Sequence, residues 1–139
     1  MATPYEKIYN RFLNGMTDFN LLDIDDDTLR DMLKDWLHSS IVKVRTSSDL
    51  TCDDELEVFN NDLTELDVEL LSMGMRLAWL DQHLNSTENV LQFIGGKEEK
   101  YYSQANHIAE LRALKDENLR EMNRLHNYYT YTNNSYFNN

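Results

Sequence analysis

The sequence has few of the residues that interrupt helices or cross-link chains. Its 139 residues include one proline, four glycines and one cysteine. Proline and glycine are the poorest helix formers, so their scarcity favours a mostly helical protein. A single cysteine, Cys52, excludes a framework of internal disulfides and is typical of a reducing compartment.

Long apolar runs and an excess of basic residues are also missing. The longest purely apolar runs are a few residues, whereas a membrane-spanning helix needs about 20. The first residues show no apolar run after a basic patch, so no signal peptide is expected. The 13 basic residues stand against 25 acidic ones, which gives a formal charge of −12. This charge disfavours a surface that binds nucleic-acid phosphates, and it favours solubility or a basic partner.

The strongest pattern in the chain lies in residues 62–84. Apolar side chains recur there at alternating spacings of three and four residues, which is typical of a helix with a continuous apolar seam: Leu63, Leu66, Leu70, Met73, Leu77, Leu80 and Leu84. A second apolar row beside it comprises Val68, Leu71, Met75 and Ala78. Two rows indicate a helix covered on more than one side. We expect it to be the central helix of a small bundle, about 34 Å long.

Three further long helices are expected around the central one. Residues 3–14 form the first, with Thr3 as its N-cap, Pro4 at the first helical position and Gly15 as its C-cap. Residues 26–44 form the second, whose acidic start and basic end suit the helix dipole. Residues 97–127 form the last.

A short helix and a tail complete the predicted fold. Ser86 is the expected N-cap of the short helix, which ends before a glycine pair. Residues 128–139 carry no charge and are rich in tyrosine and threonine, which favour extended structure. The predicted fold is therefore all-α, a small bundle of about four main helices plus one short helix. It has two parts, a helical bundle domain at 1–127 and an extended aromatic C-terminal tail at 128–139.

No residue pattern in the chain predicts a catalytic, cofactor or metal site. The aspartates within 23–27 lack the glycine and the final glutamate that a calcium-binding EF-hand loop needs. The four histidines show no zinc-binding spacing, and Cys52 lies in an acidic loop that disfavours a nucleophilic thiolate. Glycine-rich phosphate loops are absent too. We therefore expect a protein that is not an enzyme and needs no cofactor.

One alternative is a helical metal-dependent hydrolase. Glu65 and Glu69 lie one turn apart on the expected central helix, and Asp62 precedes them by about one turn. Paired carboxylates on bundled helices can hold Mg²⁺ or a pair of metal ions. No histidine completes the Glu-x-x-His pattern on other helices, so a solvated helix face is the expected interpretation.

The aromatic tail is the feature that a monomer's own core explains least. A flexible segment in water is usually charged and poor in aromatic residues. This tail instead carries Tyr128, Tyr129, Tyr131, Tyr136 and Phe137. We expect it to dock on a partner, for example by strand addition, with a disordered terminus as the alternative.

Three sequence blocks together resemble a known class of phage protein. They are residues 5–13 with the letters YEKIYNRFL, residues 29–37 with LRDMLKDWL, and residues 95–107 with GGKEEKYYSQANH. The second block follows the acidic start of its helix. In this combination the chain is similar to small structural proteins of tailed bacteriophages, of the all-helical head-to-tail connector (adaptor) type.

The resemblance implies a ring, of about twelve copies, attached below the portal at the capsid vertex. Such a ring lies in the virion, is assembled in the host cytoplasm, continues the DNA channel and offers a platform to the stopper or tail. The tail aromatics would contact the portal. Neighbouring subunits or other components would meet Val90, Leu91, Phe93 and Ile94.

The strongly acidic composition is compatible with such a ring. An acidic channel wall would let DNA pass without specific binding, because like charges repel. No membrane contact is expected. The alternative function is a small acidic inhibitor or DNA mimic that binds a basic partner.

Overall fold

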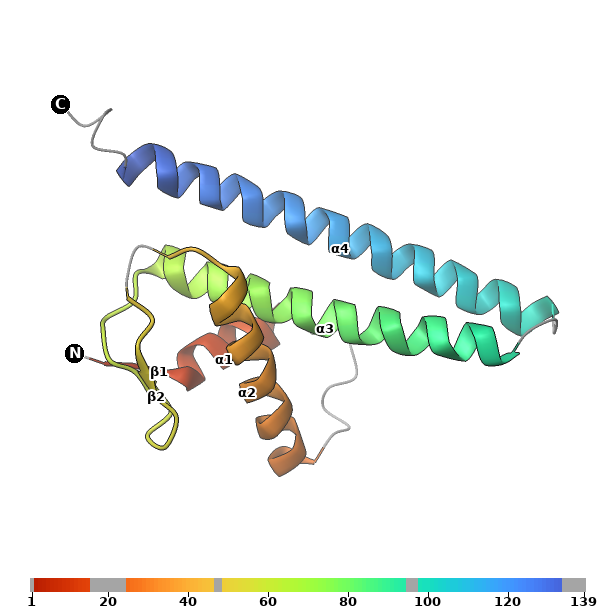
Figure 1. Cartoon of the computed structure of the whole chain (residues 1–139), viewed down its shortest axis with the longest axis horizontal. Helices are drawn as coiled ribbons and strands as arrows, with labels where there is room; N and C mark the ends of the chain where they lie inside the picture. The colour runs from red at the N-terminus through yellow and green to blue at the C-terminus, as the bar shows by residue number, and fades with distance from the viewer. Residues whose placement is uncertain (1, 16–24, 47–48, 95–97, 134–139) are drawn as a thin grey trace.

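The computed structural model describes residues 2–15, 25–46, 49–94 and 98–133, with side chains placed except within 87–104 and 128–133. The described part contains four helices and a small three-stranded sheet (Figure 1). The helices are α1 (Tyr5–Asn14), α2 (Asp26–Lys43), α3 (Glu65–Ile94) and α4 (Glu98–Asn133). The strands are β1 (Thr3–Pro4), β2 (Cys52–Asp53) and β3 (Val58–Phe59). The predicted all-α class is confirmed.

The central helix is α3, as the two apolar rows of residues 62–84 predict. It packs against α1, α2 and α4, and Figure 1 shows α4 along one side of α3 with α1 and α2 across the other. The residues of both rows are buried except Leu66 and Ala78, which are half-buried. Next to this seam Phe12 of α1 meets Trp36 of α2, with ring centroids 5.5 Å apart. Apolar burial on two sides of α3 therefore holds the three other helices together.

Side-chain caps set the starts of α2 and α3. Asp25 accepts a hydrogen bond from the backbone N–H of Thr28 at 3.2 Å, and the hydrogen bonds from Thr28 lower the pKa of Asp25. At α3 the hydroxyl of Thr64 accepts from the N–H of Asp67 at 3.1 Å, and Asp67 Oδ2 accepts from the N–H of Thr64 at 3.4 Å. This reciprocal pair is a capping box with aspartate in place of glutamate.

The first helix begins later than the sequence predicts, because Thr3 and Pro4 form β1. Both β1 and β2 pair antiparallel with β3, and Thr3 lies opposite Phe59. The Thr3 hydroxyl donates to Asn61 O and accepts from Leu63 N, each at 3.0 Å. Thr3 therefore ties the start of the chain to the entry of α3 instead of capping α1.

The predicted short helix is the last part of α3. Instead of ending near Ser86, α3 runs without a break to Ile94 and has 30 residues. No glycine or proline occurs between residues 85 and 94. The asparagines, serine and threonine there lower helix propensity by less than about 1 kcal/mol each, which is too little to end a packed helix. Ser86 is therefore an interior residue of α3.

The last helix also passes its predicted end. α4 has 36 residues and continues through 128–133, where an extended tail was predicted to begin. Tyrosine and threonine cost about 0.7 kcal/mol or less relative to alanine in a helix, so a preformed helix can extend over them. Tyr136 and Phe137 lie outside the described residues. The far part of the α3–α4 hairpin extends past α1 and α2 (Figure 1).

Candidate functional site

One stripe of side chains attaches α4 to α3, at spacings of three and four residues: Ile108, Leu111, Lys115, Asn118, Met122 and Leu125. Its polar members have partners on α3. Asn118 Nδ2 donates to Met73 O at 3.0 Å, and Lys115 Nζ lies 2.7 Å from Asp81 Oδ1. A polar layer within an apolar seam favours one register of the two helices over others. Each flank of α4, on either side of this stripe, borders a groove.

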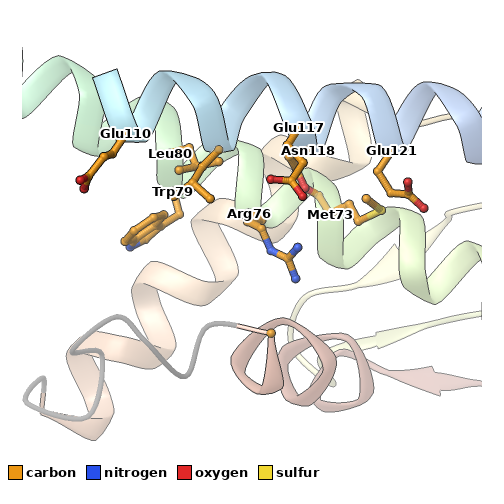
Figure 2. Close-up of a pocket in the computed structure, with 10 residues that line it drawn as sticks. Met73, Arg76, Trp79, Leu80, Glu110, Glu117, Asn118 and Glu121 are labelled. Carbon is orange, nitrogen blue, oxygen red and sulfur yellow. The ribbon is translucent and has the colours of Figure 1, made fainter. Parts of the chain in front are cut away.

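The first groove, called the acidic groove below, lies between α4, α3 and the end of α1 (Figure 2). Its volume is about 560 Å³. From α3 it is lined by Met73, Arg76, Trp79 and Leu80. From one flank of α4 it is lined by Glu110, Leu114, Glu117, Asn118 and Glu121. The groove thus has an apolar side from α3 and three carboxylates from α4.

Arg76 is the only cation that lines the acidic groove within the described part of the chain, and it is directed toward α1. Figure 2 shows its guanidinium pointing away from α4. A Cβ atom placed on Gly15 would overlap Arg76 Nη2, so the two residues touch. Gly15 is the C-cap of α1, as predicted, and a cation suits the negative end of a helix dipole. The charged groups at the exposed rim of the groove are therefore the glutamates of α4.

The wall of the acidic groove contains buried polar atoms that have no hydrogen-bond partner among the described residues. Arg76 Nε and Asn118 Oδ1 are among them. The Asn118 side chain is 5% exposed, and its amide nitrogen is already bonded to Met73 O. Leaving a buried acceptor unpaired costs about 1–3 kcal/mol. A donor from a bound molecule would remove this cost at Asn118.

The second groove, called the basic groove below, lies on the other flank of α4 and also has a volume of about 560 Å³. α4 and α3 contribute Leu119, Met122, Asn123, His126, Asn127 and Leu77. Lys43, the last residue of α2, and Arg45, two residues later, also line the groove. Arg45 N donates to His126 Nε2 at 3.3 Å. Burial, with a smaller effect of the Arg45 charge, lowers the pKa of His126, because both disfavour the charged ring.

The contact residues predicted from the sequence lie toward opposite ends of the α3–α4 hairpin (Figure 1). The last part of α3 carries Val90, Leu91, Phe93 and Ile94. The last turns of α4 carry Tyr128, Tyr129 and Tyr131. The backbone positions of these residues are described, whereas their side chains lie outside the described set.

Of the three carboxylates considered for a metal site, Glu65 and Glu69 are paired with cations of α1. Lys7 Nζ lies 3.0 Å from Glu65 Oε1, and Arg11 Nη1 lies 3.3 Å from Glu69 Oε2. Hydrogen bonds from Lys7 and Arg11 lower the pKa of Glu65. Across the described ranges, no group of three or more histidine, cysteine, aspartate or glutamate side chains is placed to hold a metal ion.

Another polar cluster centres on Asp54, in the turn between β2 and β3. Tyr5 OH donates to Asp54 Oδ1 at 2.6 Å, and His38 Nε2 lies 2.9 Å from the same oxygen. Hydrogen bonds from Tyr5 and His38 lower the pKa of Asp54, while burial raises the pKa of Tyr5. Since the three residues come from α1, α2 and the β2–β3 turn, the cluster fastens these elements together.

The two grooves were not predicted from the sequence. A signal for the acidic groove exists, because Glu110, Leu114, Glu117 and Glu121 recur at spacings that place them on one face of a helix. Such a row is normally a solvated face. Only the position of α1 beside α3 turns this face into the wall of a groove.

A family model described as YomZ prophage protein matches residues 1–130 of the chain. The chain belongs to this family. It is therefore of phage origin, in line with the resemblance of its sequence blocks to phage proteins. No curated protein and no solved structure matches the chain. Among the described helices, none has both the length and the apolar character that a membrane span requires.

Proposed function

We infer that the chain is a structural protein of the phage particle, a subunit of the ring-shaped adaptor between the portal and the stopper or tail. In this role it is not an enzyme and needs no cofactor. It acts in the virion after assembly in the host cytoplasm, and DNA passes through the ring without specific binding. The observation that carries the proposal is the long α3–α4 hairpin.

The hairpin separates two regions that the sequence marks for contacts. With 30 residues, α3 is about 45 Å long. Residues 90–94 lie near one end of the hairpin and residues 128–133 near the other (Figure 1). A connector must contact one component on each side, and a rigid hairpin of two packed helices can present two separate contact regions at a fixed distance.

The charge of the chain supports the same role. Each copy has a formal charge of −12, and a ring multiplies this charge around its channel. DNA phosphates would be repelled by such a wall, so DNA could move past it without being held.

The portal protein of the same prophage provides the test. A variant with Tyr128, Tyr129 and Tyr131 changed to serine should bind the purified portal at least about ten-fold more weakly, because buried aromatic residues dominate protein interfaces. The matched control changes Ala109 and Ala113, which are exposed on the same helix, to serine. Circular dichroism checks that helix content is retained. Equal portal binding by both variants would reject the proposal.

An acidic inhibitor or DNA mimic remains the competing function, motivated by the charge of −12. Several carboxylates are, however, engaged within the fold: Glu65 and Glu69 pair with α1, and Glu121 pairs with Arg124. A DNA mimic needs its carboxylates free for the partner. Binding that fades steeply with added salt would favour this alternative, since salt screens exposed charges.

A further inference from the structure

We propose that the acidic groove of one copy receives the end of α2 from the next copy, so that the chain associates head to tail. The inserting surface, called the Val42 edge below, comprises Val42, Lys43 and Arg45. The inference rests on the ring proposed above and names the contact that builds it.

The Val42 edge is apolar and basic at once. Val42 is 85% exposed in the last turn of α2, the highest value among the large apolar residues that the structure describes. Lys43 follows it directly, and Arg45 is exposed and forms no ion pair with any described residue. Lys43 lies 3.6 Å from Asp81, but Asp81 also has Lys115 at 2.7 Å. Lys43 can therefore turn to another carboxylate without leaving Asp81 unpaired.

The acidic groove has the complementary character. Leu114 is 39% exposed on α4, with Glu110 one turn before it and Glu117 one turn after it. Neither glutamate forms an ion pair with a described residue, whereas Glu121 is paired with Arg124 through hydrogen bonds of 3.1–3.2 Å. In the proposed contact, Leu114 and its two flanking glutamates on one copy face Val42 and its two neighbouring basic residues on the next copy.

Asn118 provides an independent sign that the groove takes a ligand. Asn118 is 5% exposed, and its buried Oδ1 acceptor in the groove wall lacks a partner within the described residues. Lysine and arginine supply N–H donors and no acceptor. The basic end of the Val42 edge therefore brings donors to the glutamates at the surface of the groove, next to this buried unpaired oxygen.

The two surfaces lie on different flanks of α4. The Val42 edge adjoins the basic groove, which is lined by Lys43 and Arg45, while Leu114 lies in the acidic groove. When two copies join through these unlike surfaces, the dimer still has one free Val42 edge and one free acidic groove. Further copies can therefore add. Such heterologous contacts produce rings when the rotation closes and filaments when it does not.

The test uses the full chain in sedimentation experiments at low salt. Glu117→Lys and Arg45→Glu should each weaken self-association by about ten-fold or more, because each places like charges together. The double variant should restore association, since lysine at position 117 of one copy then faces glutamate at position 45 of the next. The control Arg120→Glu has the same charge change as Arg45→Glu at an exposed site of α4 outside both grooves. It should associate as the unchanged chain does.

Three results would overturn the contact: a chain that stays monomeric, single variants that associate normally, or a double variant that does not recover. Portal binding is measured on the same samples to separate the two proposals. Normal portal binding together with unaffected single variants rejects the contact and keeps the adaptor role. A rescued charge swap without any portal binding keeps the contact and rejects the adaptor role.

Discussion

The two buried tyrosines of α1 differ in what their hydroxyl groups meet. Tyr5 OH donates to Asp54, while Tyr9 OH is buried and has no hydrogen-bond partner in the described part of the chain. Both rings are nearly inaccessible, at 0% and 4% exposure, so packing is similar for the two residues. Replacing each tyrosine by phenylalanine isolates the contribution of one hydroxyl group.

We expect only one of the two substitutions to destabilise the protein. Tyr5→Phe should lower the free energy of unfolding by about 1 kcal/mol, because it removes a hydrogen bond that joins α1 to the β2–β3 turn. Tyr9→Phe should leave that free energy unchanged or raise it by up to about 1 kcal/mol, because it removes a buried unpaired group. Urea unfolding measures both. A Tyr9→Phe variant as destabilised as Tyr5→Phe would contradict the described hydrogen bonds.

At the scale of elements, the α2–α3 contact depends on the lack of a side chain at Gly74. A Cβ on Gly74 would overlap Ser40 Oγ and lie 2.9 Å from Ser40 Cβ. Ser40 is itself held in place, because its hydroxyl donates to Leu71 O at 2.7 Å. Alanine at position 74 would therefore force α2 and α3 apart.

Gly74→Ala should lower the free energy of unfolding by about 1–2 kcal/mol. Overpacking costs about 1–3 kcal/mol, which outweighs the gain of about 1 kcal/mol in helix propensity. Gly15→Ala is the matched control, since its Cβ would overlap only the flexible end of Arg76 and Gly15 has an ordinary helical φ of −81°. It should change stability by less than about 0.5 kcal/mol in the same urea experiment. An unchanged free energy of unfolding in Gly74→Ala would contradict the close approach of α2 and α3 at this residue.

The sequence predicts elements well where burial alone decides them. The two apolar rows of residues 62–84 identify α3 as the central helix, and the charges at both ends of α2 locate its limits. Prediction fails where weak local preferences oppose an existing helix, as at Ser86 and at residues 128–133. It also fails at Thr3, whose partners Asn61 and Leu63 are distant in sequence. Hydrogen bonds between such distant residues leave no local pattern.

The candidate site was predictable only in part. The uncharged aromatic residues at the end of the chain and the apolar residues 90–94 predict contact regions by composition, and these contacts stay a prediction. The acidic groove and the Val42 edge depend on which flank of α4 faces α1 and which faces the end of α2. That arrangement follows from tertiary packing, which periodicity within one helix does not specify.

At the scale of the whole molecule, self-repulsion and association act on the same chain. A charge of −12 opposes bringing copies together, while the Val42 edge and the acidic groove offer a local attraction. Added salt screens both the repulsion between copies and the attraction at the contact. The shape of the contact and the surface of the portal must therefore favour the ring over a free monomer. The proposed adaptor role would join the hairpin, the two grooves and the acidic composition in one assembly.

The most direct measurement of this role is the amount of the chain in purified phage particles after induction of the prophage. Quantitative mass spectrometry gives its copy number relative to the portal subunit. The adaptor proposal predicts that the chain is present in a fixed ratio close to one adaptor per portal subunit. Particles that contain the portal but lack the chain, while the chain is abundant in the induced cells, would contradict it.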